Sequence, residues 1–473
     1  MEHLKEEQEE PVSPMGQYFN SSVLCIYIIG VLEFEVPIDD LQTFALIKNV
    51  FLPINPRFSS IMVQDKDGEK RWKQVEVNLK DHVHFPIFPE GKTVESYDKC
   101  FHDYLSSIAM ERLSQGKPLW EIHIINHPTK DACSSVIFKL HHALGDGYSL
   151  VGALLSCLQR ADNPSLPLSF PSLRASKQHT QSSSKSFWRR FSWMVSSALN
   201  TVSDFGWSIM KSSIISDDKT PIRSGDEGAE FCPICISNME FSMDHIKNIK
   251  SRLGVTVNDV ITGIVFYGTR LYMQDMDFES KTADSTALVL LNTRNIEGYQ
   301  SINEMLNTKA KGPWGNKISF LHVPIPKLNQ NKMSNPLDFI WESHDIIKRK
   351  KQSLAVALTG TLLDMETKFR GHEAVAKHLR GTVRKSSAVI SSLVGPIQQM
   401  SLANHPVKGL YFTLAGGPES LAISIMSYVG VLRVTLKTEK EFIDEQKLKS
   451  CMQSAFQMIL KAAMENSGQK EKY

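Results

Sequence analysis

The sequence predicts a mixed α/β fold in two domains, and three observations support this. At 473 residues the chain is longer than one hydrophobic core usually supports. Its composition, 42% hydrophobic and 22% charged, is that of an ordinary folded protein. Short apolar runs typical of strands alternate with segments of helical periodicity in both halves. We therefore expect mixed sheets of the α+β type, covered by helices.

The first domain is expected over residues 11–161, after an acidic tail at 1–10. This tail lacks the basic start and apolar core of a signal peptide. The elements expected in chain order are a strand at 23–36, a helix at 39–50, two strands within 58–77, a helix at 97–111, strands at 122–125 and 135–140, and a helix from about 148.

Residues 162–230 are expected to connect the two domains. From 162 to 186 the composition shifts to Pro, Ser, Gln and Thr, as in a linker. Residues 187–210 then carry an apolar stripe at helical spacing, preceded by basic residues and containing three tryptophans. This pattern is typical of a helix lying in a membrane interface. The alternative is a helix that packs its stripe on the protein's own core.

The second domain is expected over residues 231–473, and it again mixes both kinds of element. No run of 18 apolar residues predicts a membrane-spanning helix anywhere in the chain. The elements expected are a helix at 257–272, strands at 287–291 and 318–323, a long helix at 341–363, a strand at 388–394, two strands within 421–438, and a closing helix at 443–464.

The net charge and the cysteines indicate which binding partners to expect and in which redox compartment the protein works. A net charge of +2 gives no global attraction to nucleic acid, so no nucleic-acid partner is expected. Seven scattered cysteines indicate reduced thiols in a protein that faces the cytosol. Cys232 and Cys235 form the only close pair, and without a second pair they predict no metal site.

The most informative stretch is residues 141–147, which read His-His-Ala-Leu-Gly-Asp-Gly. It lies between a predicted strand and a predicted helix, where glycines allow a sharp turn and close approach of another group. A histidine at such a position can reach into a cleft and act as a general base near neutral pH. Because neighbouring side chains of an extended backbone point in opposite directions, only one of His141 and His142 faces the substrate easily.

The expected chemistry is removal of a proton from an acceptor hydroxyl by His142 while that oxygen attacks an activated acyl carbon. A thioester is a suitable donor, because its thiolate leaves readily and no nucleophilic serine or cysteine is needed. Accordingly, the chain has no G-x-S-x-G elbow, Walker A loop or dinucleotide fingerprint. His141 is expected to support its neighbour. Asp146 is expected to brace the turn, with Arg294 as its candidate partner.

These seven residues match the HHxxxDG motif of the wax ester synthase/diacylglycerol acyltransferase family. That family is related in fold to chloramphenicol acetyltransferase and to peptide synthetase condensation domains. The resemblance extends from about residue 10 to 465 and is closest to the plant members. Further similar signatures are Glu-Pro-Val-Ser-Pro at 10–14, Pro-Leu-Trp-Glu at 118–121, Asn258-Asp259, Asn-Thr-Arg at 292–294 and Gly395-Pro396.

The resemblance implies that His142 is the catalytic base, with fatty acyl-CoA as donor and a long-chain alcohol or diacylglycerol as acceptor. It implies two chloramphenicol-acetyltransferase-like domains, arranged as a pseudo-dimer around an interfacial tunnel, and no cofactor besides the acyl-CoA substrate. It also implies a membrane surface as partner, at the cytosolic face of the endoplasmic reticulum or at the plasma membrane. The substrate-binding residues expected from these motifs are Gly147, Asn258, Asp259, Arg294 and Ser392.

Several alternatives stay open. Ser392 stands where the family usually has asparagine, so altered activity, or a non-catalytic acyl-lipid-binding protein, is conceivable. Asp-Phe-Gly-Trp at 204–207 resembles a motif of BAHD acyltransferases, which act on soluble alcohol or phenolic acceptors, but that motif belongs near the end of a BAHD chain. Asn258 and Asp259 also have a structural interpretation, as an N-cap and a first-turn acid of a helix.

Overall fold

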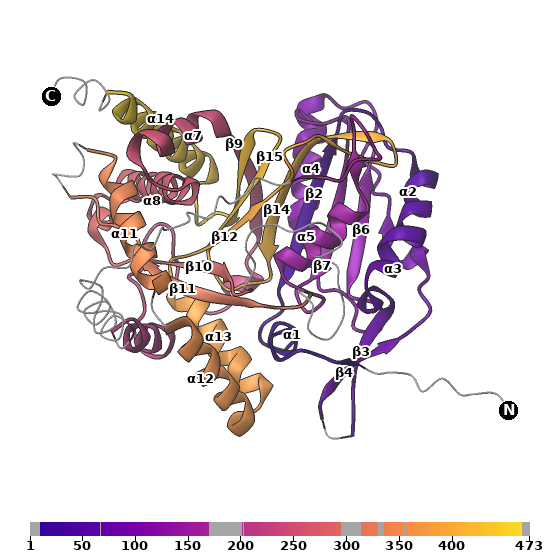
Figure 1. Ribbon diagram of the computed structural model, residues 1–473, viewed down its shortest axis with the longest axis horizontal. Coiled ribbons are helices and arrows are strands. Elements are labelled where there is room, and N and C mark those ends of the chain that lie inside the picture. The colour runs from indigo at the N-terminus through magenta and orange to yellow at the C-terminus, as the bar shows by residue number, and fades with distance from the viewer. Residues whose placement is uncertain are drawn as a thin grey trace, which may run out of the picture.

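The fold is described from a computed structural model, covering residues 10–66, 68–169, 201, 203–294, 314–329, 335–352 and 355–465. Two large mixed sheets lie side by side, and helices cover them (Figure 1). A small antiparallel sheet of β1 (Glu10–Pro11), β4 (Lys70–Gln74) and β3 (Ser60–Gln64) is attached to the first half. The mixed α/β fold expected from the sequence is confirmed.

The first large sheet has seven strands in the order β5-β6-β7-β2-β14-β13-β8. Every neighbouring pair is antiparallel except β5 and β6, which are parallel. The strands are β5 (Val83–His84), β6 (Trp120–Ile125), β7 (Ser134–His141), β2 (Tyr27–Phe34), β14 (His405–Ala415), β13 (Met400–Leu402) and β8 (Gln159–Arg160).

The second large sheet has six strands in the order β11-β10-β12-β15-β16-β9. Strands β10, β12 and β15 are parallel to one another, and the other pairs are antiparallel. The strands are β11 (Ile318–Pro324), β10 (Thr286–Asn292), β12 (Ala388–Val394), β15 (Leu421–Tyr428), β16 (Val431–Glu439) and β9 (Ile234–Ser242).

The helices range from single turns to six turns. The α-helices are α1 (Pro14–Phe19), α2 (Asp40–Leu46), α3 (Leu52–Ile54), α4 (Val94–Met110), α5 (Gly147–Ser156), α7 (Met243–Leu253), α8 (Val257–Met276), α11 (Asp338–Gln352), α12 (Ala355–Arg370), α13 (His372–Lys385) and α14 (Glu445–Glu465). A π-helical turn, η1 (Ile47–Phe51), follows α2, and short 3₁₀ turns are η2 (Pro56–Ser59), η3 (Leu79–Asp81), η4 (Ala229–Phe231) and η5 (Phe278–Thr282).

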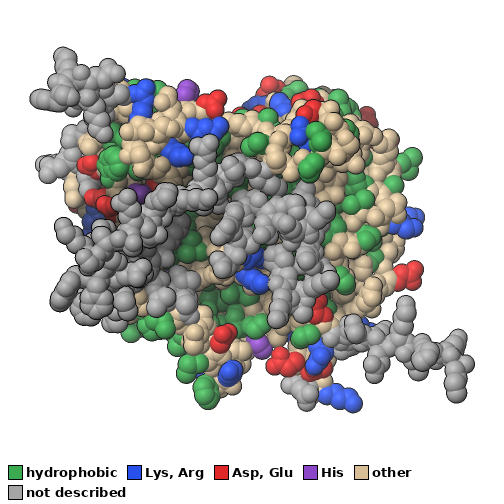
Figure 2. Space-filling view, in the orientation of Figure 1, with side chains coloured by type: hydrophobic (Ala, Val, Ile, Leu, Met, Phe, Trp, Pro, Cys, Tyr) green, Lys and Arg blue, Asp and Glu red, His purple; other side chains and the backbone are tan. Residues whose placement is uncertain are grey.

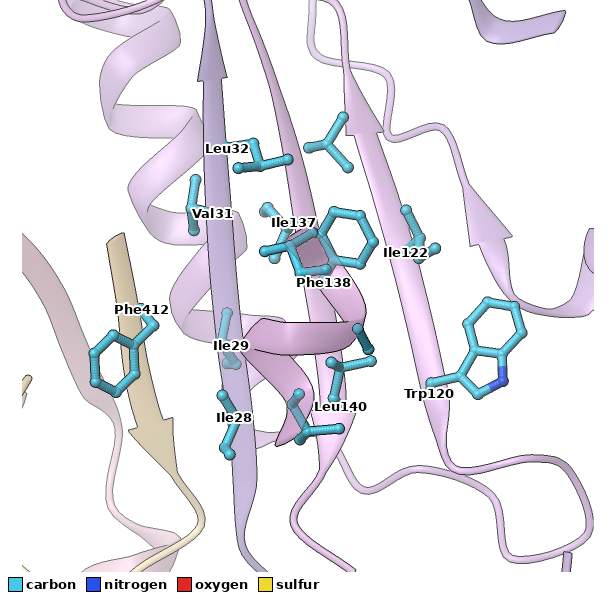
Figure 3. Packing of buried hydrophobic residues seen from close by; sticks show 14 of the residues in the cluster. Ile28, Ile29, Val31, Leu32, Trp120, Ile122, Ile137, Phe138, Leu140 and Phe412 are labelled. Atoms are coloured by element: carbon cyan, nitrogen blue, oxygen red, sulfur yellow. The ribbon is translucent and has the colours of Figure 1, made fainter. Parts of the chain in front are cut away.

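Each half has its own hydrophobic core. In the first half, buried side chains of β2, β6 and β7 pack together, among them Leu32, Ile122 and Phe138 (Figure 3). In the second half, α8 is held closely against its neighbours. A Cβ atom on Gly263 would lie 2.5 Å from Ile340 of α11, and one on Gly268 would lie 2.7 Å from Met452 of α14. Only glycine permits these helices to approach so closely.

The chain crosses between the halves near its C-terminus. Strands β13 and β14, from the range expected to form the second domain, complete the first sheet, where β14 pairs with β2 along its length (Figure 1). A buried ion pair also joins the halves, with Arg433 Nη1 of β16 2.5 Å from Glu33 Oε2 of β2. The domain ranges 11–161 and 231–473, with 162–230 between them, stay a prediction.

Most expected elements are present, and three regions differ or lie partly outside the described residues. The stretch at 341–363 falls in two helices, α11 and α12, and residues 353–354 lie outside the described part. Of the helix expected at 187–210, only 201 and 203–210 are described, and they are helical. The tail at 1–10 is described only at Glu10. Among the described helices, none is long and apolar enough to cross a membrane.

Candidate active site

The turn at 141–147 connects strand β7 to helix α5, and both elements fix its backbone. Strand β7 ends at His141, opposite Tyr27 of β2, and the His142 amide continues this pairing by donating to the Ile26 carbonyl oxygen at 2.9 Å. Helix α5 then begins at Gly147, with Asp146 as its N-cap, because Asp146 Oδ1 accepts from the Ser149 amide at 3.1 Å. Strand and helix together hold the intervening residues in one conformation.

His142 is buried, with 3% of its surface exposed. Its Nδ1 atom lies 2.9 Å from Asn316 Oδ1, and Asn316 Nδ2 donates to the His142 carbonyl oxygen at 2.9 Å. Since that second bond assigns the amide nitrogen of Asn316, the amide oxygen faces the ring and Nδ1 must carry the proton. The lone pair is then on Nε2. Burial lowers the pKa of His142, opposed by the charge of Asp146, so the neutral base is favoured.

His141 points away from its neighbour, as expected from the alternation along β7. It is fully buried, its Nδ1 accepts from the Ala143 amide at 3.0 Å, and its ring meets Tyr27 edge-on at 5.2 Å. Its Nε2 lies 3.4 Å from Cys25 Sγ. Burial lowers the pKa of His141 to about 3, so it is a neutral structural element of the turn.

The expected pairing of Asp146 with Arg294 is confirmed. Arg294 Nη1 lies 2.6 Å from Asp146 Oδ2, and Arg294 Nη2 lies 3.0 Å from Oδ1, a bidentate pair with side chains only 2% and 1% exposed. Asp146 Oδ2 also accepts from the Lys317 amide at 2.9 Å. Because the carboxylate caps α5 and binds both partners from the second half, its contacts are those of a brace.

Sequence patterns did not single out the segment 314–317, which closes the site from the second half. Ser149 Oγ accepts from the Gly315 amide at 3.0 Å, and Trp314 Nε1 donates to the Leu144 carbonyl oxygen at 3.1 Å. Asn316, the hydrogen-bond partner of His142, is the most important residue missed. Its only signal is a Gly-Asn pair immediately before a predicted strand, and such a pair is too common to indicate a contact across the molecule.

Two cavities meet at His142, and they share the side chains of Leu290, Ile318 and Leu414. The first, here called the apolar cavity, encloses ≈ 530 Å³ and is lined mainly by hydrophobic residues, such as Phe19, Leu24, Phe320 and Leu379. Among the described residues its one charged lining residue is Glu419, which is paired with buried Lys437 at 2.9 Å. The second, here called the polar cavity, encloses ≈ 570 Å³.

The polar cavity contains three of the expected substrate-binding residues, Gly147, Arg294 and Ser392. A Cβ atom on Gly147 would lie 3.1 Å from Leu393 Cδ1, so the Leu393 side chain would have to shift by a few tenths of an ångström. Gly147 also places the N-terminus of α5 at this cavity, where the helix dipole favours negative charge. Asn292 and Ser391 add further polar side chains.

Asn258 and Asp259 line neither cavity in the part of the chain that the structure describes. The N-cap of α8 is Thr256, not Asn258, and Asp259 completes a capping box by accepting from the Thr256 amide at 2.8 Å. Asp259 Oδ2 also lies 2.8 Å from His344 Nδ1. These contacts account for Asp259 structurally, while a role of either residue in substrate binding stays a prediction.

The remaining sequence signals lie away from His142. Asp204, in the segment resembling the BAHD motif, lies on the helix at 203–213 and contacts Lys350 Nζ at 3.1 Å. Cys232 and Cys235 are free thiols. Within the described ranges, no group of three His, Cys, Asp or Glu residues is arranged to hold a metal ion.

The two mixed sheets have the fold of a peptide synthetase condensation domain. A starter condensation domain of rhizomide synthetase, solved with C8-CoA and Leu-SNAC, covers 96% of this chain and 94% of its own, with a TM-score of 0.53 at 10% identity. The wax ester synthase/diacylglycerol acyltransferase from Marinobacter aquaeolei VT8 covers 96% and 99%, with a TM-score of 0.59 at 14% identity. These likenesses establish the fold.

Sequence comparison then establishes the family. The wax ester synthase/diacylglycerol acyltransferase catalytic domain matches residues 52–261, and the WS/DGAT C-terminal domain matches residues 314–460. Wax ester synthase/diacylglycerol acyltransferase 9 of Arabidopsis thaliana is 30% identical over 467 residues, which cover 94% of both chains. The chain belongs to the wax ester synthase/diacylglycerol acyltransferase family, and it is an O-acyltransferase.

Proposed function

We propose that this protein transfers a fatty acyl group from acyl-CoA to a long-chain alcohol or diacylglycerol, with His142 as the general base. The observation that carries the proposal is the fixed tautomer of His142. Its Nδ1 donates a hydrogen bond to the Asn316 amide oxygen, so the lone pair is on Nε2, where the two cavities meet. General-base catalysis contributes typically about 10²- to 10⁴-fold in rate.

The proposed reaction needs no nucleophilic side chain of the enzyme, because the acceptor oxygen attacks the thioester directly. His142 Nε2 takes the proton of the acceptor hydroxyl as its oxygen forms a bond to the thioester carbonyl carbon. The resulting oxyanion is favoured by the N-terminus of α5 at the polar cavity. Collapse breaks the carbon–sulfur bond, and the thiolate of coenzyme A receives the proton from His142. The Asn316 amide oxygen stabilises the imidazolium in between.

The two cavities suit different parts of the substrates. Coenzyme A is polar and anionic, and the polar cavity contains the side chains of Asn292, Arg294 and Ser391. The alkyl chain of an alcohol offers only apolar surface, and the apolar cavity offers the matching lining. We therefore assign the thioester to the polar cavity and the alkyl chain of the acceptor to the apolar cavity. No cofactor is proposed besides the acyl-CoA substrate.

We further propose a membrane surface as the source of the apolar substrate, at the cytosolic face of the endoplasmic reticulum or at the plasma membrane. Exposed hydrophobic side chains support this proposal, namely Trp207 and Ile214 near the helix at 203–213, and Met365 and Phe369 on α12. Figure 2 shows hydrophobic side chains at the surface of the region where α12 and α13 lie. Serine at all four positions should reduce sedimentation with phosphatidylcholine vesicles. Unchanged sedimentation would place the contact elsewhere.

The test of the function is an assay of the purified full chain with palmitoyl-CoA and, separately, hexadecanol, dioleoylglycerol and a soluble phenol, read by mass spectrometry. Wax ester or triacylglycerol is the expected product. Product from the phenol alone would instead support a BAHD-like transferase. Binding of acyl-CoA without any ester would support a non-catalytic acyl-lipid-binding protein, for which Ser392 in the polar cavity would be a candidate cause.

A further inference from the structure

Phe320 of β11 lies between the apolar cavity and a further cavity behind it, here called the rear cavity. Both cavities are lined by Phe320 and by Leu379 of α13. The rear cavity encloses ≈ 420 Å³ and does not include His142 in its lining. These two residues are the ones that the linings of both cavities share, so they lie at the boundary, here called the partition, between a space that reaches His142 and a space that does not.

Strand β11 orders the three spaces along one line. Residues two apart on a strand share a face, so Ile318, Phe320 and His322 lie in a row with steps of about 7 Å. Ile318 lines both cavities at His142, Phe320 lines the apolar and rear cavities, and His322 lines the rear cavity but not the apolar one. The strand therefore leads from the base, past the partition, into the rear cavity.

The rear cavity suits the end of an alkyl chain up to a defined point. Its apolar lining includes Leu362 and Leu363 of α12 and Ile209, and its polar lining includes Ser212, Thr359, His378 and Thr382. His322 also lines it, and its Nδ1 lies 3.1 Å from Ser208 Oγ. Burying a methyl group against such polar side chains is unfavourable, so a chain should stop before His322.

We propose that Phe320 sets the length of the alcohol that this enzyme accepts, by closing the apolar cavity against the rear cavity. This inference rests on the proposed function, because it takes the apolar cavity as the site of the acceptor chain. Removing the ring would join the two cavities and add about 7 Å of path before His322. At about 1.3 Å per carbon of an extended chain, with bonds of about 1.5 Å, that is room for about five more carbons.

The experiment measures kcat/KM of the full-length enzyme with palmitoyl-CoA and a series of primary alcohols from C8 to C24. Three variants shorten a side chain of the partition, namely Phe320→Ala and Phe320→Leu on β11 and Leu379→Ala on α13. A fourth, Phe320→Trp, enlarges the side chain and should narrow the passage between the two cavities. Phe320→Ala should move the preferred alcohol about five carbons longer, and Phe320→Leu and Leu379→Ala should move it less. Phe320→Trp should move it shorter. Beyond the wild-type optimum, each newly buried methylene should raise kcat/KM of Phe320→Ala about fourfold.

Two controls separate the possible failures. Leu41→Ala changes an α2 side chain that is 82% exposed, and the alcohol profile should match the wild type. Phe412→Leu changes a lining residue of the polar cavity, on β14 (Figure 3), and its alcohol optimum should stay in place. If the wild type and Leu41→Ala form no ester with any alcohol or with dioleoylglycerol, the proposed function fails. If they form ester with dioleoylglycerol alone, or are active on alcohols but no Phe320 or Leu379 variant moves the alcohol optimum, the inference about Phe320 is overturned.

Discussion

Asn316 holds the ring of His142 so that Nε2, the atom that we propose as the base, is unprotonated. Its amide nitrogen donates to the His142 carbonyl oxygen and its amide oxygen accepts from Nδ1, both at 2.9 Å, so the ring is held in the tautomer with a free Nε2. Asn316 comes from the segment before β11 in the second half of the chain, and His142 follows β7 in the first. The hydrogen bonds that fix this tautomer therefore form only when the two halves are assembled.

Replacing Asn316 should change both rate and pH dependence. Asn316→Asp places a carboxylate on Nδ1, which raises the pKa of His142 from its lowered value. Because the base must be unprotonated, activity falls as pH drops through this pKa, and the acid limb of kcat/KM should lie at higher pH in the variant. Asn316→Leu removes the acceptor and should lower kcat strongly; losing a tautomer-fixing partner costs up to roughly 10⁴-fold in a serine protease triad. An acid limb that does not move in Asn316→Asp would refute this role.

The pair formed by Asp146 and Arg294 should be needed mainly for stability and for closing the site. Asp146→Asn keeps an N-cap for α5 but removes the carboxylate that binds Arg294 in the bidentate pair, and breaking this buried pair should cost about 3–5 kcal/mol of unfolding free energy. Arg294→Met leaves the carboxylate unpaired and should cost a similar amount.

The double variant tests whether these costs belong to one interaction. Asp146→Asn with Arg294→Met should be less destabilised than the sum of the two single variants, because no isolated charge is left buried. Urea denaturation followed by circular dichroism gives the three values. Strict additivity would show that the two side chains act independently.

His141 should make the protein less stable in mild acid. Its pKa is about 3 when folded and near 6.5 when unfolded, so between these values only the unfolded chain takes up the proton. His141 therefore leaves the free energy of unfolding unchanged above pH 6.5. As pH falls from 6.5 toward 3, it lowers the free energy of unfolding by about 1.4 kcal/mol per pH unit. His141→Gln should lower the slope of unfolding free energy against pH between 4 and 6 by about that amount. Parallel slopes for both proteins would contradict the buried neutral state.

Part of the site could be predicted from the sequence because local pattern encodes it. A strand, a Gly-containing turn and a helix are recognisable within 20 residues, and they place His142, Asp146 and Gly147 correctly. Arg294 could be proposed as the partner of Asp146 from its position after a strand. Asn316 could not, since its contact spans 174 residues of chain and depends on how the two halves pack.

In the fold, too, local sequence patterns predict single elements but not the pairing of distant ones. The helical spacing of apolar residues predicts helices such as α4 and α14, and short apolar runs predict strands β2 and β7. The crossing of β13 and β14 into the first sheet is a long-range pairing that no local pattern encodes. Phe320 and Leu379 illustrate the point for the cavities, because each looks like an ordinary core residue until β11 and α13 are seen side by side.

The central claim is that Nε2 of His142 removes the acceptor proton, and one measurement tests it most directly. Ester formation from palmitoyl-CoA and hexadecanol is compared between wild type and His142→Ala, with His141→Gln as the matched neighbour and circular dichroism as the check of folding. We expect His142→Ala to lose about 10²- to 10⁴-fold in kcat while folding normally, and His141→Gln to retain far more activity. A folded His142→Ala enzyme that forms ester at the wild-type rate would contradict the account.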